Sequence, residues 1–176
     1  ASDVYKRQTY DNIVTGTFLK RPNRFIAYVE VKGDVKTCHV KNTGRCQELL
    51  VPGCTVVLEF HPKAKEMKRK TEYDLIAVYK GNLLINMDSQ APNQAALEWI
   101  REKEAKGLSL ENVGIPTNIR REVTHGESRF DLAFELKDEV TGKTVPAFME
   151  VKGVTLEKEG NVFFPDAPTI LSLIHI

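Results

Sequence analysis

Two apolar stretches, each interrupted by an acidic residue, constrain the fold more than any other feature of this sequence. They span 129–134, with Asp131, and 148–153, with Glu150 followed by Lys152. As β-strands they would place Glu150 and Lys152 on one face, and Asp131 opposite to its apolar neighbours. A carboxylate in an apolar strand is costly unless its charge is compensated. Two such carboxylates on adjacent strands, with a lysine beside one, indicate a site for Mg²⁺ or Mn²⁺, the alternative being a solvated strand face.

The first half of the chain has the pattern of a small β-barrel. Apolar and polar residues alternate in short runs, and a helix is expected between the third and fourth runs at Asn42–Leu50. The expected strands are Ile13–Lys20, Arg24–Lys32, Val35–Val40, Cys54–Phe60 and Thr71–Tyr79, with Gly81–Met87 as a last strand or a linker. Three strands, a helix and two strands match the order of an OB-fold, a barrel that binds nucleic acids and saccharides.

Two connections of this barrel are basic. They fall at 20–24 and 62–70, the two loops that an OB-fold commonly uses for ligand contact. Because Lys+Arg number 25 against 24 for Asp+Glu, any nucleic-acid surface must be a local patch. Solvated loops are the alternative, but we predict DNA contact by Lys20, Arg21, Arg24, Lys63, Lys65, Lys68, Arg69 and Lys70.

The second half predicts an α+β arrangement. Asp88–Pro92 marks a boundary, so we expect domains at 9–87 and 88–176. A helix is expected at Asn93–Lys106, where Glu98 either faces partly inward or lies on the helix surface. The strands expected after it are Ile119–Thr124, Ser128–Leu136, Val145–Lys152 and a short one at Phe163–Phe164.

The cysteines and the chain ends carry further expectations. Cys38, Cys46 and Cys54 have no C-x-x-C spacing, which is typical of reduced thiols in a cytoplasmic protein. No apolar run reaches the roughly 18 residues of a membrane-spanning helix, so no membrane association is expected. Residues 1–8 and 170–176 look like translated adapter sequence, which predicts a longer native protein and a C-terminally truncated second domain.

Several phrases together resemble a known family. Asp131 followed by Glu150-x-Lys152 is the half-conserved signature of the PD-(D/E)xK nucleases. From about Ile13 to Thr169 the chain resembles the sugar fermentation stimulation protein A family of bacteria and archaea. The matching phrases are Arg24-Phe25, His39-x-x-Asn42-Thr43-Gly44, Pro52-Gly53, Pro92-Asn93, Ser128-Arg129-Phe130-Asp131, Glu150-Val151-Lys152 and Phe164-Pro165-Asp166-Ala167. The family continues with Thr-x-Arg-Gly, whereas here Thr169 is followed by Ile-Leu-Ser, which supports truncation.

The resemblance implies a DNA-binding protein with an N-terminal OB-fold β-barrel and a PD-(D/E)xK nuclease-like α/β domain. By resemblance, Asp131 and Glu150 hold Mg²⁺ or Mn²⁺, Glu98 is an outer or second-metal ligand, and Lys152 orients or activates the attacking water. Asp166 matches the family motif without an assigned role.

Two functions remain open. One is a DNA-binding protein whose metal site cleaves phosphodiesters, as a Mg-dependent nuclease. The other is a non-enzymatic DNA-binding regulator of sugar metabolism genes, in which the same residues are relics. A carbohydrate-binding OB-fold is suggested by the family name alone, and nothing in the sequence indicates an oligomeric state.

Overall fold

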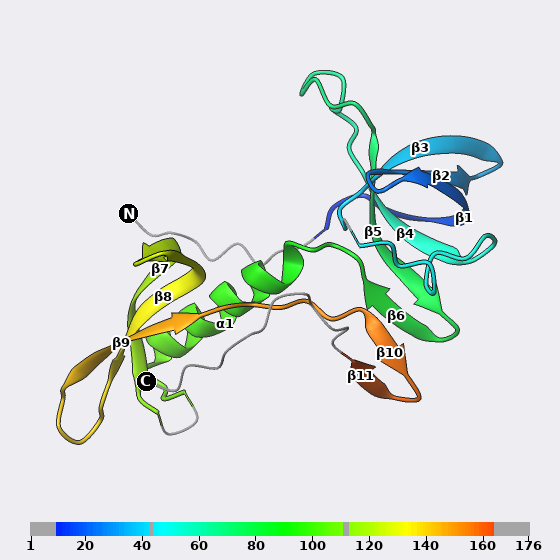
Figure 1. Cartoon of the computed structure of the whole chain (residues 1–176). Coiled ribbons are helices and arrows are strands. Elements are labelled where there is room, and N and C mark those ends of the chain that lie inside the picture. Colours follow the sequence, from blue (N-terminus) through cyan, green and yellow to red (C-terminus); the bar gives the residue numbers. More distant parts are fainter. Residues whose placement is uncertain (1–9, 43, 111–112, 164–176) are drawn as a thin grey trace.

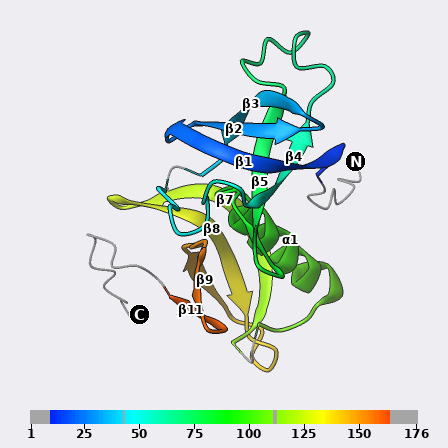
Figure 2. The ribbon, with the colours of Figure 1, turned by 90° about the vertical axis from the view of Figure 1, so that its right-hand side faces the viewer.

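The chain forms two lobes joined at the start of a long helix (Figure 1). The computed structural model describes residues 10–42, 44–110 and 113–163. One lobe is a β-barrel built from the first half of the chain, and the other combines the helix with a three-stranded sheet. The two lobes lie one above the other when the molecule is turned (Figure 2). The order and pairing of the elements confirm the expected architecture, an N-terminal OB-fold followed by an α+β lobe.

Six strands make the first sheet, in the order β3-β2-β1-β4-β5-β6, and a parallel pairing of β3 with β5 closes the barrel. All the other pairings in this sheet are antiparallel. The strands are β1 (Ile13–Asn23), β2 (Ile26–Val31), β3 (Asp34–Val40), β4 (Thr55–Phe60), β5 (Tyr73–Lys80) and β6 (Leu83–Asn86).

Apolar side chains at alternating strand positions fill the interior of the barrel. Phe18, Val29, Val40, Leu58 and Leu75 are each at most 2% exposed and belong to one cluster. The long strand β1 pairs with β2 on one side and with β4 on the other, as closure of a small barrel requires. The core therefore fixes which face of each strand is turned outward, and with it the residues that form the site.

The prediction of a short helix at Asn42–Leu50 is wrong. No helix occurs among the described residues of this segment. The chain turns around Cys46, whose carbonyl accepts from the N–H groups of Leu49 and Leu50. The Asn42 side chain accepts from the N–H of Gly44, a local bond that competes with helix formation. Thr43 of this segment lies outside the described residues.

The second lobe packs helix α1 (Ala91–Lys106) against an antiparallel sheet of β7 (Ile115–His125), β8 (Ser128–Lys137) and β9 (Thr144–Met149). Leu97 and Ile100 of the helix pack with Leu132 and Phe134 of β8. Gly107 ends the helix in the left-handed conformation at φ 61°, as expected for a C-terminal glycine.

Strand β9 is shorter than expected. It ends at Met149 rather than Lys152, because the N–H of Val151 donates to the Asp131 side chain instead of to a strand carbonyl. A small hairpin of β10 (Leu156–Lys158) and β11 (Asn161–Phe163) follows. It includes Phe163 of the expected last strand, whereas Phe164 and Asp166 lie outside the described residues.

The junction between the lobes is held by Asp88, which is 2% exposed. Its carboxylate lies 2.7 Å from the ammonium of Lys41 at the end of β3. Both the N–H and the hydroxyl of Ser89 donate to the carbonyl of Lys41. The entry to α1 is therefore attached to the barrel. In the described part of the chain, no helix is long and apolar enough to span a membrane.

Candidate functional site

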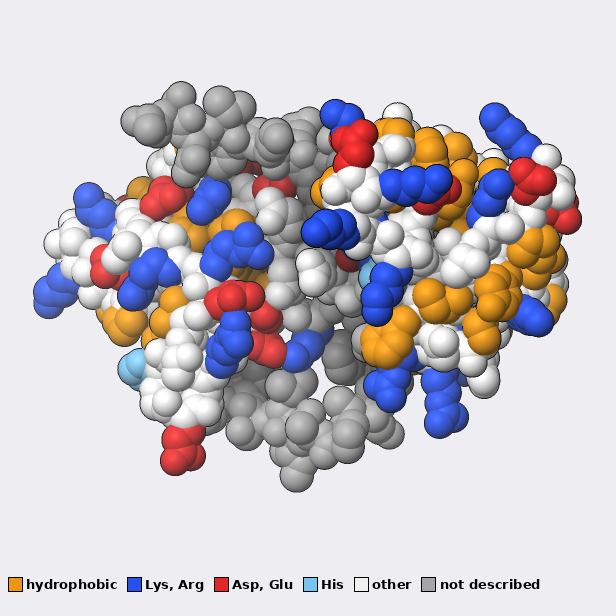
Figure 3. Space-filling view, turned by 90° about the horizontal axis from the view of Figure 1, so that it is seen from above, with side chains coloured by type: hydrophobic (Ala, Val, Ile, Leu, Met, Phe, Trp, Pro, Cys, Tyr) orange, Lys and Arg blue, Asp and Glu red, His pale blue; other side chains and the backbone are white. Residues whose placement is uncertain are grey.

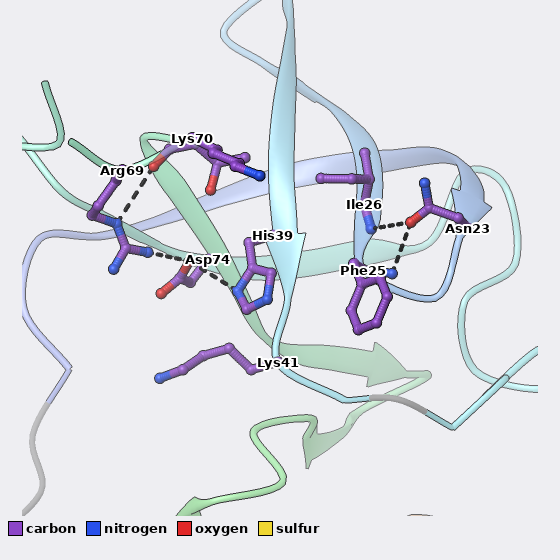
Figure 4. Close-up of a pocket in the computed structure, with 9 residues that line it drawn as sticks. Asn23, Phe25, Ile26, His39, Lys41, Arg69, Lys70 and Asp74 are labelled. Carbon is purple, nitrogen blue, oxygen red and sulfur yellow. Dashed lines mark hydrogen bonds and ion pairs between the residues drawn. The ribbon is translucent and has the colours of Figure 1, made fainter.

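The two basic connections meet at one pocket on the barrel (Figure 4). The pocket has a volume of about 580 Å³. The turn between β1 and β2 contributes Asn23, Phe25 and Ile26. His39 comes from β3 and Lys41 directly follows that strand, and the end of the β4–β5 connection contributes Arg69, Lys70 and Thr71. Of the basic residues predicted to contact DNA, Arg69 and Lys70 line this pocket, whereas Lys20, Arg21 and Arg24 do not.

Asp74 lies at the centre of this pocket's polar network, between Arg69 and His39 (Figure 4). It is 3% exposed, and its Oδ1 lies 2.6 Å from an Arg69 nitrogen and 3.4 Å from His39 Nδ1. Its Oδ2 lies 3.0 Å from His61 Nε2. These partners compensate a buried carboxylate that would otherwise be costly. The guanidinium of Arg69, predicted to contact DNA, is thus engaged with the protein itself.

An exposed aromatic side chain stands at the rim. Phe25 is 51% exposed, and the guanidinium of Arg24 lies 5.6 Å from its ring centre. The Asn23 side chain accepts from the N–H groups of Phe25 and Ile26, which fixes the turn that presents the ring. Such a ring offers a flat apolar surface beside positive charge, which is the combination that binds single-stranded nucleic acid.

A second hollow, of about 650 Å³, is lined by Asn23 and Arg24 of the same turn. Its basic lining residues are Lys20, Arg21, Arg24 and Arg45. Arg45 was not among the predicted DNA-binding residues; its position beside the His39–Gly44 phrase was the available signal.

Arg21 itself is largely committed to the main chain. Its two terminal nitrogens donate to the carbonyls of Asn42, Gly44, Arg45 and Arg24 at 2.6–2.8 Å. Its guanidinium therefore holds the segment that follows β3. Of the eight residues predicted to bind DNA, Arg21 and Arg69 are the two whose guanidinium groups bond to protein carbonyls or to a carboxylate.

The lysines of the β4–β5 connection are all exposed. Lys63, Lys65, Lys68 and Lys70 surround the buried Ala64, which anchors the loop, and the N–H of Arg69 donates to the Ala64 carbonyl. Figure 3 shows basic side chains on both lobes, interspersed with acidic ones. Charge alone therefore does not single out a binding face, and the two loops stand out by their shared pocket.

Two of the predicted metal residues, Asp131 and Glu150, lie on neighbouring segments of the second lobe, and the third, Glu98, lies on helix α1. Leu132 of β8 pairs with Met149 of β9, which places Asp131 beside the segment that contains Glu150. The Asp131 carboxylate accepts from the N–H of Val151 and from the side chain of Asn93 on α1, both at 2.8 Å. Both of its oxygen atoms thus have a donor from the protein.

The other predicted site residues, Glu98, Glu150 and Lys152, form hydrogen bonds with near neighbours in the sequence. The ammonium of Lys152 contacts the carboxylate of Glu150, and Glu98 accepts from Gln94 on the same helix. Within residues 10–42, 44–110 and 113–163, Glu98, Asp131 and Glu150 do not form a set whose ligand atoms all lie within 4.8 Å of one another. Metal binding by these three residues stays a prediction.

A set of that kind occurs on the barrel instead, and sequence analysis missed it. Ligand atoms of Glu59, His61 and Asp74 all lie within 4.8 Å of one another. The alternation of Glu59 and His61 placed them on one face, but nothing in the sequence showed that Asp74 pairs with Glu59 across β4 and β5.

Burial shapes the ionisation of two groups near the pocket. Burial raises the pKa of the Cys38 thiol to about 12, and the negative charge of Asp74 adds to this. Burial alone would lower the pKa of Lys41, but its hydrogen bond to Asp88 and the charge of Asp88 raise it above the ordinary value. Lys41 therefore stays positively charged, although only 25% of its side chain is exposed.

Comparison with known proteins gives two family matches. Residues 19–87 match the SfsA N-terminal OB domain, and residues 90–176 match the sugar fermentation stimulation protein RE domain.

Among curated relatives, a sugar fermentation stimulation protein homolog of Alkaliphilus oremlandii is 54% identical, over 95% of this chain and 67% of its own length. A homolog from Clostridium beijerinckii is 49% identical over 95% of this chain and 67% of its own length. The chain thus spans about two thirds of the length of the curated relatives that it matches.

A solved structure, that of Pyrococcus furiosus SfsA in complex with Ca²⁺, superposes with a TM-score of 0.67 at 23% identity. The match covers 95% of this chain and 65% of that one, and it supports the fold. Given the identity to curated homologs over nearly its whole length, the chain belongs to the sugar fermentation stimulation protein family.

Proposed function

We propose that the protein binds DNA through its barrel, at the pocket where the two basic connections meet. The observation that carries this proposal is that Phe25 from one connection and Lys70 from the other line the same pocket. Exposed lysines attract phosphate, and stacking of a base on an aromatic ring contributes about 1–3 kcal/mol. The site thus supplies both of the interactions on which binding to a single strand depends.

The test is DNA binding by the 176-residue chain, measured by fluorescence anisotropy at several salt concentrations. Replacing Lys63, Lys68 and Lys70 with Gln should flatten the plot of log affinity against log salt, by about 0.7 for each phosphate of a single strand that a lysine no longer neutralises. Phe25→Ala should weaken binding without changing this slope, because stacking releases no counterions.

A matched control removes three exposed lysines of the second lobe: Lys106, Lys137 and Lys143, each replaced with Gln. This control should leave the slope unchanged. A slope that falls equally in both triple variants would show that net charge, and not the barrel pocket, governs binding, and would refute the proposal.

A second candidate function is metal-dependent phosphodiester cleavage in the second lobe. It is favoured by Asp131 and Glu150 lying on neighbouring segments, because carboxylate oxygens suit Mg²⁺ or Mn²⁺. Asp131 and Glu150 would hold the ion, and Lys152, which contacts Glu150, would place a positive charge beside it. When bound, such an ion would neutralise phosphate charge and lower the pKa of a bound water. The Pyrococcus furiosus relative was solved with Ca²⁺, a cation that also takes oxygen ligands.

The test measures melting temperature with and without millimolar Mn²⁺, together with cleavage of plasmid and single-stranded DNA. A bound ion should raise the melting temperature by mass action. Asp131→Ala and Glu150→Ala should abolish the rise, whereas Lys152→Ala should keep most of it, because an ammonium is not a ligand. Binding that is absent, or unchanged in Asp131→Ala, would favour the DNA-binding regulator of sugar metabolism genes.

We also infer a cytoplasmic location. This inference is supported by the three cysteines, Cys38, Cys46 and Cys54, all of which are free thiols.

A further inference from the structure

We propose that the barrel carries a separate site for a divalent transition-metal ion, best suited to Zn²⁺, formed by Glu59, His61 and Asp74. Glu59 and Asp74 are cross-strand partners on β4 and β5, and His61 follows Glu59 by two residues. Side chains two apart along a strand share a face, so the three converge by the register of the sheet alone. This site lies in the other lobe from Asp131 and Glu150.

The distances suit a small ion. His61 Nε2 lies 3.0 Å from Asp74 Oδ2 and 3.7 Å from Glu59 Oε2. Zinc bonds to nitrogen and oxygen are about 2.0–2.2 Å long, so two ligand atoms of a tetrahedral ion lie about 3.3–3.6 Å apart. The observed separations bracket that range. An ion could therefore be bound with small side-chain adjustments.

Each carboxylate has one oxygen held by the protein and the other turned to His61. Glu59 Oε1 accepts from the N–H of Asp11 at 3.1 Å, and its Oε2 is the atom near His61. Asp74 Oδ1 contacts Arg69 and His39, and its Oδ2 is the atom near His61. Partners that fix the distal atom of a ligand are the usual outer shell of a metal site.

The charge balance also favours a cation. Of the two carboxylates, those of Glu59 and Asp74, only Asp74 contacts a guanidinium of the described residues, that of Arg69. The ammonium of Lys41 also acts on Asp74, but it is paired with the carboxylate of Asp88. The side chains of Asp74, Glu59 and His61 are 4%, 15% and 22% exposed, so the group is shielded yet reachable from solvent. One imidazole with two carboxylates selects zinc-like ions over Mg²⁺, which prefers oxygen ligands and water.

A metal ion at this site would order the second basic connection, residues 62–70. His61 is the first residue after β4, and its N–H donates to the Glu72 carbonyl at 2.8 Å, which closes the base of the loop. An ion joining His61 to Asp74 would fasten that base to β5. It would therefore order the loop that carries Lys63, Lys65, Lys68 and Lys70 without contacting DNA itself.

The test titrates the chelator-treated 176-residue chain with Zn²⁺ by calorimetry, and with Co²⁺ by visible absorption. We expect one ion per chain and the d–d bands of four-coordinate Co²⁺, without a thiolate-to-metal band, because no cysteine is a ligand. His61→Gln and Glu59→Gln should weaken binding by about 100-fold or more, and the outer-shell change His39→Gln by about tenfold. Circular dichroism checks that each variant is folded.

Asp34→Asn, which alters an exposed carboxylate on the same barrel, is the matched control, and it should bind Zn²⁺ as the unaltered chain does. If Asp131→Asn loses the ion while His61→Gln keeps it, the metal belongs to the second lobe and the barrel site is refuted. No binding by the unaltered chain would refute it as well. The measurement involves no DNA, so failure of the DNA-binding proposal leaves its outcome unaffected.

Discussion

A nitrogen of the Arg69 guanidinium lies 2.6 Å from Oδ1 of Asp74, a side chain that is 4% exposed. Removing one partner of a buried pair leaves the other uncompensated, at a cost of about 3–5 kcal/mol. We expect Asp74→Ala to lower the free energy of unfolding by about 3 kcal/mol, at the low end of that range, because Arg69 is partly exposed. Urea denaturation followed by tryptophan fluorescence or circular dichroism measures this.

The control for this prediction is an exposed pair. Arg129 and Glu122 lie 2.8 Å apart, with side chains 66% and 65% exposed. Arg129→Ala should change stability by less than about 1 kcal/mol. If Asp74→Ala were as mild as Arg129→Ala, the network around Asp74 would not be a structural element of the barrel.

Arg21→Lys should destabilise the protein although it conserves charge. An ammonium cannot bind all four of the carbonyls that the two terminal nitrogens of Arg21 bind. Because three of these bonds are exposed to water, which can replace the lost donor, we expect a cost of about 1 kcal/mol. Thermal denaturation should show this destabilisation. The exposed Arg24→Lys should stay within about 0.5 kcal/mol of the unaltered chain.

A variant that removes the charge, Arg21→Gln, separates a structural role from a DNA contact. If Arg21 acts only through its bonds to main-chain carbonyls, the salt slope of DNA binding in Arg21→Gln stays at its original value, because no phosphate loses its partner. A shallower slope with unchanged stability would instead assign Arg21 to phosphate.

Thiol labelling should be slow in the folded protein. Burial raises the pKa of all three cysteines, to about 12 for Cys38, and only the thiolate reacts. A raised pKa means that less thiolate is present at any given pH, so the labelling rate should rise about tenfold for each unit that the pH increases below the pKa. Mass spectrometry after alkylation should find Cys54, the partly exposed thiol, modified before Cys38.

Unfolding in urea should abolish the difference between the cysteines. Rapid labelling of Cys38 in the native protein at neutral pH would show that the barrel opens more readily than its packing indicates.

The sequence predicted the strands because alternation directly reports which side of a strand is buried, as at Phe18 and Val29. It failed at Asn42–Leu50, where a helical pattern is overridden by Arg21, a residue about twenty positions earlier that binds the carbonyls of this segment. Strand β9 was predicted three residues too long, because the Asp131 side chain takes the N–H of Val151. Both errors come from side chain to main chain bonds between distant segments.

The candidate sites differ in how far they could be foreseen. The basic loops follow from strand order, since the connections of a barrel of this order have known places. The Glu59, His61 and Asp74 cluster could not be foreseen, because it depends on the register between β4 and β5. Each of these residues, taken singly, looks like an ordinary polar residue of a surface strand.

The contact between Lys41 and Asp88 limits where this chain can be joined to a relative to make a chimera. Asp88 follows the last barrel strand in the chain, yet its buried carboxylate is matched to a lysine at the end of β3. A chimera that takes residues up to Met87 from one relative and the remainder from another inherits the two charges from different parents. A crossover placed after Ser89 keeps both charges, and the bonds of Ser89 to the Lys41 carbonyl, within one parent. The position at which the protein can be recombined therefore lies between Ser89 and the start of α1, beyond the point where the barrel strands end.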